Sequence, residues 1–178
     1  MISKAIFAGF GGQGILMMGY TLAYAAMKED RHVTYLPSYG AEVRGGTANC
    51  TIAVGNEDIA SPIASAPDFL VLMNAPSLDR FQSCLRKGGR CLVNTSLIHE
   101  KVSRRDIRVY EVPATEKAEQ LGDIRAANMV MLGAFLKVAE LVRPETVLAV
   151  IERNFAKRPE LLERNRQAFW EGYHAIGA

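Results

Sequence analysis

The residues with the clearest chemical meaning in this chain are glycines, which form two clusters near the N-terminus. The first cluster reads Gly9-Phe10-Gly11-Gly12-Gln13-Gly14, and the second reads Ser38-Tyr39-Gly40-Ala41-Glu42-Val43-Arg44-Gly45-Gly46. Glycine permits tight turns and lets the backbone approach a bound group closely. Two such segments at the ends of neighbouring strands predict a site for an anionic ligand or for a tightly docked partner.

The first cluster lies between a strand pattern and a helix pattern. The apolar run 5–8 is typical of a buried strand, and from Ile15 the apolar residues recur at helical spacing. The free N–H groups at the start of a helix favour a phosphate or a carboxylate. The spacing Gly9-x-Gly11-x-x-Gly14 also fits the dinucleotide-binding fingerprint.

The residues that follow do not complete that fingerprint. A dinucleotide site expects an acidic residue about 20 residues further on, at the end of the second strand, to hold a ribose hydroxyl. The second strand is expected at 33–36, and it runs into Pro37-Ser38 without an acidic residue. A stand-alone Rossmann-type oxidoreductase that binds a nucleotide is therefore an alternative to the main hypothesis.

Four polar residues are candidates for contact with a ligand, and each also has a structural alternative. Glu42 and Arg44 are two positions apart, so their side chains project the same way from an extended loop. Arg44 is suited to a phosphate or carboxylate, or to a salt bridge with Glu42 or a neighbouring subunit. Asn74 ends a strand where ligands gather, or caps the next helix. Gln13 donates to a ligand or braces its loop.

The two glycine clusters together resemble those of the gamma subunit, or domain III, of 2-oxoacid:ferredoxin oxidoreductases. Within that family they are most similar to the 2-oxoglutarate and ketoisovalerate branch, and the beta subunit of indolepyruvate oxidoreductase is the related alternative. The resemblance extends from Ile2 to about Phe155. It includes the segments Ser61-Pro62-Ile63, Ala66-Pro67-Asp68, Phe69-Leu70-Val71-Leu72-Met73-Asn74 and Asn128-Met129-Val130-Met131-Leu132-Gly133.

The resemblance implies a subunit of an enzyme that oxidatively decarboxylates a 2-oxoacid, transfers the acyl group to coenzyme A and reduces ferredoxin. Thiamine diphosphate with Mg²⁺ and iron–sulfur clusters serve that reaction. The chain lacks a Gly-Asp-Gly metal motif, because Gly122-Asp123 is followed by Ile124, and its three cysteines are too few to ligate a cluster alone. We therefore expect these cofactors on alpha, beta and ferredoxin-like delta subunits, and none bound by this chain.

The same resemblance sets the expected role of the chain. It is not catalytic alone and has no catalytic or metal-binding residues, and its glycine loops line the coenzyme A path or a subunit seam. The amino-acid sequence of the loops most resembles the 2-oxoglutarate branch, so 2-oxoglutarate is the favoured substrate. Pyruvate, branched-chain 2-oxoacids and indolepyruvate are the alternatives. A purely structural subunit is a further alternative, and an isolated chain is expected to be able to form a homodimer.

Composition agrees with an intracellular folded domain. The 178 residues carry a net charge of +2, which gives no electrostatic reason to expect nucleic acid or a membrane surface. No signal peptide or membrane span is evident, so we expect the cytoplasm. The odd, widely spaced cysteines Cys50, Cys84 and Cys91 fit a reducing compartment.

Strand and helix patterns alternate along the chain. Strands are expected at 4–8, 33–36, 48–54, 69–74, 91–94 and 107–112. Helices are expected at 15–28, 77–85, 114–121, 126–142, 144–155 and 159–176. This order predicts a Rossmann-like, three-layer α/β/α sandwich with a mostly parallel sheet, or a mixed one. We expect a single gamma-type domain over 1–178, with a C-terminal helical part from about residue 126.

Two helices in that C-terminal part have notable apolar surfaces. The helix at 126–142 is apolar on most of its circumference, so it is expected to be central or to lie partly at a subunit interface. On the last helix, Trp170 and Tyr173 are expected to pack on the core or to anchor an interface.

Overall fold

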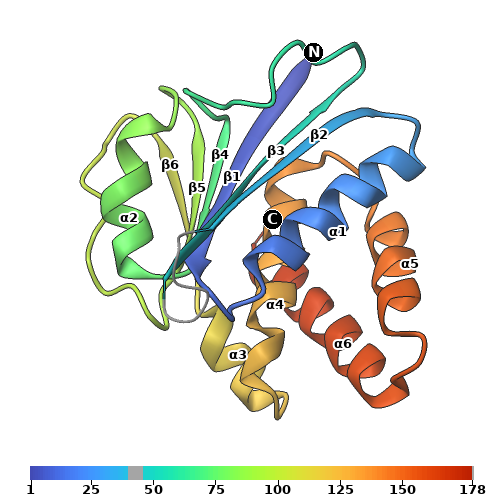
Figure 1. Ribbon diagram of the computed structural model, residues 1–178. Helices are drawn as coiled ribbons and strands as arrows, with labels where there is room; N and C mark the ends of the chain where they lie inside the picture. The colour runs from blue at the N-terminus through green and yellow to red at the C-terminus, as the bar shows by residue number, and fades with distance from the viewer. Residues whose placement is uncertain (40–45, 178) are drawn as a thin grey trace.

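The computed structural model of the chain describes residues 1–39 and 46–177. Within these residues the centre of the fold is a six-stranded sheet in the order β2-β3-β1-β4-β5-β6 (Figure 1). The strands are β1 (Ile2–Phe10), β2 (His32–Tyr39), β3 (Thr47–Gly55), β4 (Phe69–Leu72), β5 (Arg90–Asn94) and β6 (Arg108–Val112).

The sheet is mixed because one strand is reversed. β1, β4, β5 and β6 are parallel, whereas β3 is antiparallel to both of its neighbours, β1 and β2. The connection between β2 and β3 is too short for a crossover helix, so these two strands form an antiparallel pair. The reversal places the start of β3 beside the end of β1, where the first glycine cluster begins.

The helices cover the two faces of the sheet unequally. Figure 1 shows α2 alone on one face, and α1 and α4 on the other, with α5 and α6 outside them. The three-layer prediction is therefore confirmed, with one thin layer. The helices are α1 (Ile15–Lys28), α2 (Ala75–Phe81), α3 (Ala114–Gln120), α4 (Ala127–Ala139), α5 (Pro144–Phe155) and α6 (Pro159–Ala175), with short 3₁₀ turns η1 (Gln82–Cys84) and η2 (Ile124–Ala126).

Several predicted boundaries differ from the structure for local reasons. The strand expected at 33–36 continues through Pro37 to Tyr39, because β2 is an edge strand that can lack an N–H group. The helix expected at 126–142 ends at Ala139, where Glu140 adopts a left-handed conformation with φ 52°. The strand expected at 69–74 ends at Leu72, before the cap of α2.

The core on the α4 side of the sheet is aromatic at its centre. The Phe135 ring of α4 lies edge-on to Phe7 of β1, with 4.9 Å between ring centroids, and to Phe69 of β4, with 5.5 Å. Every residue of α4 from Ala127 to Leu136 is buried. The α4 helix is therefore mostly apolar because it is central to the fold of this chain, which is the first of its two expected placements.

The α4 and α6 helices touch through their backbones. Gly133 of α4 lies against the carbonyl group of Phe169, and Gly172 of α6 lies against the carbonyl group of Val130. A Cβ atom at either glycine would overlap the opposite carbonyl oxygen. The last helix is therefore part of the core. Its Trp170 packs against the core cluster, with 5.5 Å between the ring centroids of Trp170 and Phe169.

The carboxylates of Glu29 and Asp123 link the outer helices to the rest of the fold through hydrogen bonds. Glu29, after α1, accepts hydrogen bonds from the backbone N and Nε of Arg143 and from Thr146 Oγ1, at 2.9, 3.2 and 2.6 Å. Asp123, before η2, accepts hydrogen bonds from Arg125 and Arg164. The hydrogen bonds from Arg125, against the opposing effect of desolvation, lower the pKa of Asp123 to about 2.

We predict that Gly172→Ala lowers the free energy of unfolding by about 1–3 kcal/mol, because the new methyl group forces α6 away from the Val130 carbonyl. Alanine has the higher helix propensity, so propensity alone predicts the opposite sign. Urea denaturation measures the effect. Gly177→Ala is the matched control, because no atom lies within 4 Å of its added Cβ. Equal stability of the two variants would contradict the backbone contact.

Candidate functional site

The first glycine cluster forms the turn between β1 and α1. β1 ends at Phe10 and α1 begins at Ile15, so the whole reversal takes place in residues 11–14. Gly12 and Gly14 have φ values of 97° and 73°, in the left-handed region that side chains other than glycine rarely adopt. The turn therefore needs glycine at these two positions for its backbone conformation.

Gln13 braces this turn from within. Its Oε1 accepts a hydrogen bond from the Phe10 backbone N at 2.6 Å, and its Nε2 donates to the Met73 carbonyl at 3.3 Å. Gly9 lies against the side chains of Gln13 and Met73. A Cβ atom at Gly9 would be 2.5 Å from Gln13 Oε1 and 2.9 Å from Met73 Cβ. Of the two roles considered for Gln13, the structure shows the bracing role.

Asn128, in the first turn of α4, holds the other side of the glycine turn. Its Nδ2 donates to the Gly14 carbonyl at 3.2 Å, and the residue is 4% exposed. A Cβ at Gly14 would overlap this amide group. Asn128 was considered only as part of the family resemblance. The signal that was missed is a single carboxamide among the apolar residues 127–136 of this helix, which needs a hydrogen-bond partner when buried.

The second glycine cluster ends beside the first. The Gly11 backbone N donates to the Gly46 carbonyl at 2.8 Å, and Phe10 is paired with Thr47 in the register of β1 and β3. Ser38 is exposed near the end of β2, which β3 separates from β1. The structure thus brings the end of the second predicted segment against the first. The candidates Gly40, Glu42, Arg44 and Gly45 lie outside the described residues, as does the side chain of Tyr39.

Two buried asparagines, Asn74 after β4 and Asn94 at the end of β5, accept hydrogen bonds from the first N–H groups of helices. Asn74 Oδ1 accepts a hydrogen bond from Ser77 N at 2.9 Å, at the start of α2. Asn94 Oδ1 accepts from the N–H groups of Ala114 and Thr115, at the start of α3. The capping role considered for Asn74 is therefore present. Its Nδ2 is buried and has no hydrogen-bond partner among the described residues.

An apolar hollow of about 570 Å³ lies over the glycine turn. It is lined by Phe10, Gly11, Gly12, Gly14, Ile15, Leu16, Met17 and Ala48. The first turn of α1 has no acidic residue and no side-chain cap, so its N–H groups are available to oxygen atoms. The arrangement suits a molecule with an apolar arm and an oxygen-rich or anionic group.

The described residues offer little chemistry of their own. Within 1–39 and 46–177 there is no group of three or more His, Cys, Asp or Glu side chains placed to hold a metal ion. Burial raises the pKa of the Cys50 and Cys91 thiols to about 12, which makes both poor nucleophiles. No helix in the described part of the chain is long and apolar enough to cross a bilayer.

Comparison with known proteins gives consistent matches. The family model described as pyruvate ferredoxin/flavodoxin oxidoreductase matches residues 4–175. Ketoisovalerate oxidoreductase subunit VorA of Methanothermobacter marburgensis is 46% identical over 72% of this chain, which spans only 27% of the length of that relative. The 2-oxoglutarate synthase subunit KorC of Methanocaldococcus jannaschii is 33% identical, over 93% of this chain and 89% of that protein.

Among solved structures, the gamma subunit of keto/oxoacid ferredoxin oxidoreductase from Geobacter sulfurreducens has the same fold. Its TM-score is 0.82 at 26% sequence identity, and the match covers 97% of each chain. The mixed sheet with unequal helical layers is therefore the fold of that gamma subunit.

We predict that Gly14→Ala destabilises the chain by more than Gly12→Ala does. Both substitutions strain a left-handed backbone at about 1–2 kcal/mol, but only the Gly14 methyl group also collides with Asn128. Urea denaturation of both variants checks this order.

The Asn128→Ala variant tests the cause. If the collision is responsible, Gly14→Ala should cost less free energy in the Asn128→Ala background than in the wild type, a coupling that a double-mutant cycle detects. Strict additivity of the two substitutions would show that the asparagine does not close the turn.

Proposed function

The chain belongs to the pyruvate ferredoxin/flavodoxin oxidoreductase family, and from this we propose that it is the gamma-type subunit of a multi-subunit 2-oxoacid:ferredoxin oxidoreductase. The observation that carries the proposal is the family match over residues 4–175, together with relatives that are subunits of 2-oxoglutarate and ketoisovalerate oxidoreductases. In the proposed reaction a 2-oxoacid loses carbon dioxide, its acyl group passes to the thiol of coenzyme A, and ferredoxin takes the electron pair.

In this proposal the chain completes a site that other subunits supply with catalytic groups. Thiamine diphosphate, Mg²⁺ and the iron–sulfur clusters are assigned to alpha, beta and ferredoxin-like delta subunits, with ferredoxin as the electron acceptor. The sequence supports this division, since its three cysteines are too few for a cluster and Ile124 interrupts the Gly-Asp-Gly motif.

The glycine turn is the part of this chain that we assign to coenzyme A. The uncapped start of α1 offers N–H groups to the oxygen atoms of the phosphates or amides. The apolar wall formed by Phe10, Leu16 and Met17 suits the aliphatic arm that carries the thiol. By covering that arm, the chain would help to keep water away from the acyl group.

Two substrates lead the list of candidates for different reasons. The amino-acid sequence of the two glycine clusters favours 2-oxoglutarate, by its resemblance to that branch of the family. The 46% identity to ketoisovalerate oxidoreductase subunit VorA favours a branched-chain 2-oxoacid. The chain itself carries no residue that distinguishes them in the described part of the structure, so we assign the selecting pocket to another subunit.

The first test is purification of the native complex through an affinity tag on this chain. We expect reduction of a viologen dye that depends on both coenzyme A and a 2-oxoacid, with the highest kcat/KM for 2-oxoglutarate or ketoisovalerate. The isolated chain is the control and should be inactive. A purified chain with no partner subunits and no activity with any 2-oxoacid would contradict the proposal.

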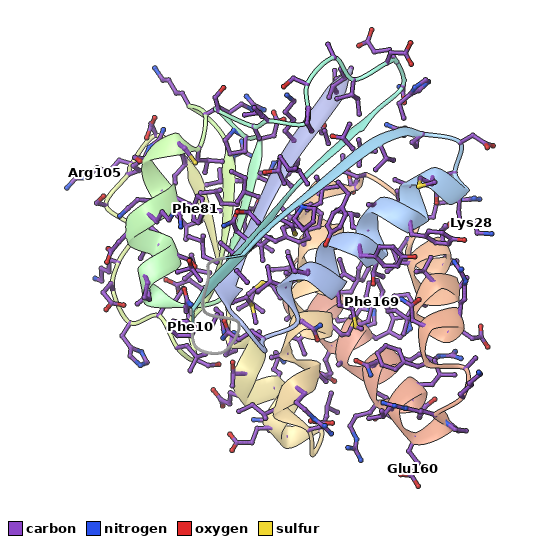
Figure 2. The ribbon with its side chains drawn as sticks, viewed as in Figure 1. Phe10, Lys28, Phe81, Arg105, Glu160 and Phe169 are labelled. Carbon is purple, nitrogen blue, oxygen red and sulfur yellow. The ribbon has the colours of Figure 1, made fainter. Side chains whose placement is uncertain are left out.

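Arg44→Glu tests the assignment of the loops to coenzyme A. Loss of one charge-assisted hydrogen bond costs about 1.5–3 kcal/mol, so KM for coenzyme A should rise roughly 10–100-fold, while KM for the 2-oxoacid is unchanged. Arg105→Glu is the charge-matched control, because Arg105 is exposed near α2 on the far face of the sheet (Figure 2). An unchanged KM for coenzyme A in Arg44→Glu would instead favour a loop that contacts only other subunits.

A further inference from the structure

One side of α1 carries exposed apolar side chains outside the hollow over the glycine turn. We call it the α1 face and define it by Tyr20, Tyr24 and Met27. Tyr20 and Met27 are exposed by 42 and 58%, and they are two of the ten exposed large hydrophobic residues in the described part of the chain. Along the helix these positions repeat at three- and four-residue spacing, so they form one stripe.

The α1 face is uncharged and held in place. From Ile15 to Met27 the helix has no charged residue. Tyr20 stacks on Tyr24 at 5.8 Å between ring centroids and meets Tyr35 edge-on at 6.4 Å. The Tyr35 hydroxyl donates to the Leu16 carbonyl at 2.9 Å. A helix exposed to water normally carries charges on its outer face, so this stripe has the character of a contact surface.

The C-terminal end of the α1 face is basic. Lys28 Nζ lies 5.8 Å and Arg153 Cζ lies 4.4 Å from the centroid of the Tyr24 ring. They border a groove of about 550 Å³ between α1 and α5. Arg143 in this groove is paired with Glu29, but neither Lys28 nor Arg153 has a carboxylate partner among the described residues. Figure 2 shows Lys28 at the C-terminal end of α1.

We infer that the α1 face binds the remainder of the oxidoreductase, through an apolar ridge that ends in carboxylates opposite Lys28 and Arg153. The inference rests on the proposed function. In ketoisovalerate oxidoreductase subunit VorA, the segment that matches this chain is only 27% of the length. The occupant that we propose is a polypeptide homologous to the rest of VorA. In VorA the matched segment is part of a much longer chain and so has a constant neighbour, and the α1 face has the chemistry of such a contact.

A second copy of this chain fits the α1 face less well. A two-fold axis parallel to the stripes would bring Lys28 of one copy beside Lys28 of the other, so like charges would meet. An axis perpendicular to the stripes would make the two α1 helices antiparallel, so Lys28 of each would lie beside the start of the other α1. That helix start is uncapped, has no acidic residue in its first turn and carries the positive end of the helix dipole. The paired faces would therefore repel at both ends. Carboxylates on a different partner satisfy Lys28 and Arg153 instead.

Amide hydrogen exchange, compared between the isolated chain and the purified complex, tests the inference. We expect the complex to protect peptides from α1 and the adjoining end of α5, whether the partner polypeptide is separate or continuous with this one. Mass spectrometry must identify the partner as homologous to the rest of VorA.

Tyr20→Glu and Met27→Glu test the α1 face by mutation. Each should weaken association with the identified partner by at least about thirtyfold, as expected for residues near the centre of an interface. Ile63→Glu and Ile124→Glu are matched controls, because these side chains are 64 and 55% exposed on other elements. Lys28→Glu should weaken association less, and its effect should shrink as salt rises. All variants should keep the wild-type midpoint of urea unfolding.

The outcomes separate this inference from the proposed function. An active complex that shows no protection of α1 and tolerates Tyr20→Glu would overturn the α1 face alone. A stable dimer of the isolated chain that Tyr20→Glu dissociates, in a complex that the substitution leaves intact, would assign the face to a second copy and also overturn it. A chain without any VorA-like partner and without 2-oxoacid activity would overturn both.

Discussion

The turn between β1 and α1 is held from two sides, and the rest of the structure positions the groups that hold it. Gln13 fills the turn from within by binding Phe10 and Met73, and Asn128 closes it from outside by binding the Gly14 carbonyl. Asn128 can reach Gly14 only because α4 is held under the sheet. The α4 helix in turn depends on its backbone contacts with α6. A glycine turn near the N-terminus is therefore supported by the last helix of the chain, more than a hundred residues away in sequence.

The reversal of β3 explains why two glycine clusters are found together. In an all-parallel sheet, the loop after β2 would lead into a crossover helix, and its far end would leave the site. Here the chain returns directly as β3 and pairs with β1, so Gly46 comes to lie on Gly11. Where a dinucleotide enzyme places an acidic residue after its second strand, this chain places the second glycine cluster. Among the described residues, the two clusters meet at the hydrogen bond from Gly11 N to the Gly46 carbonyl, just before the start of α1.

Much of this architecture could be predicted from the sequence, because strong local patterns determine it. The limits of α1 and α5 were predicted without error, since glycines or proline mark their starts. What could not be predicted depends on contacts between distant segments. The apolar surface of α4 indicated burial but not its partner, and the backbone contact at Gly172 leaves no local signal in the sequence. Bracing by Gln13 and capping by Asn74 were among the alternatives, and only the three-dimensional neighbours decided between them.

The incomplete dinucleotide fingerprint shows what such a motif specifies. The spacing of Gly9, Gly11 and Gly14 encodes a strand, a tight reversal and a close helix start, and the structure has all three. The ligand is determined by what surrounds that start. Among the described residues, the neighbours here are the Gly46 carbonyl and the apolar side chains of Phe10, Leu16 and Met17, in place of an acid for a ribose. Such a wall has more to offer an extended acyl carrier, or the apolar surface of another subunit, than a nucleotide that is held by its sugar. The same turn can therefore serve a subunit that completes the active site of a larger complex without doing the chemistry itself.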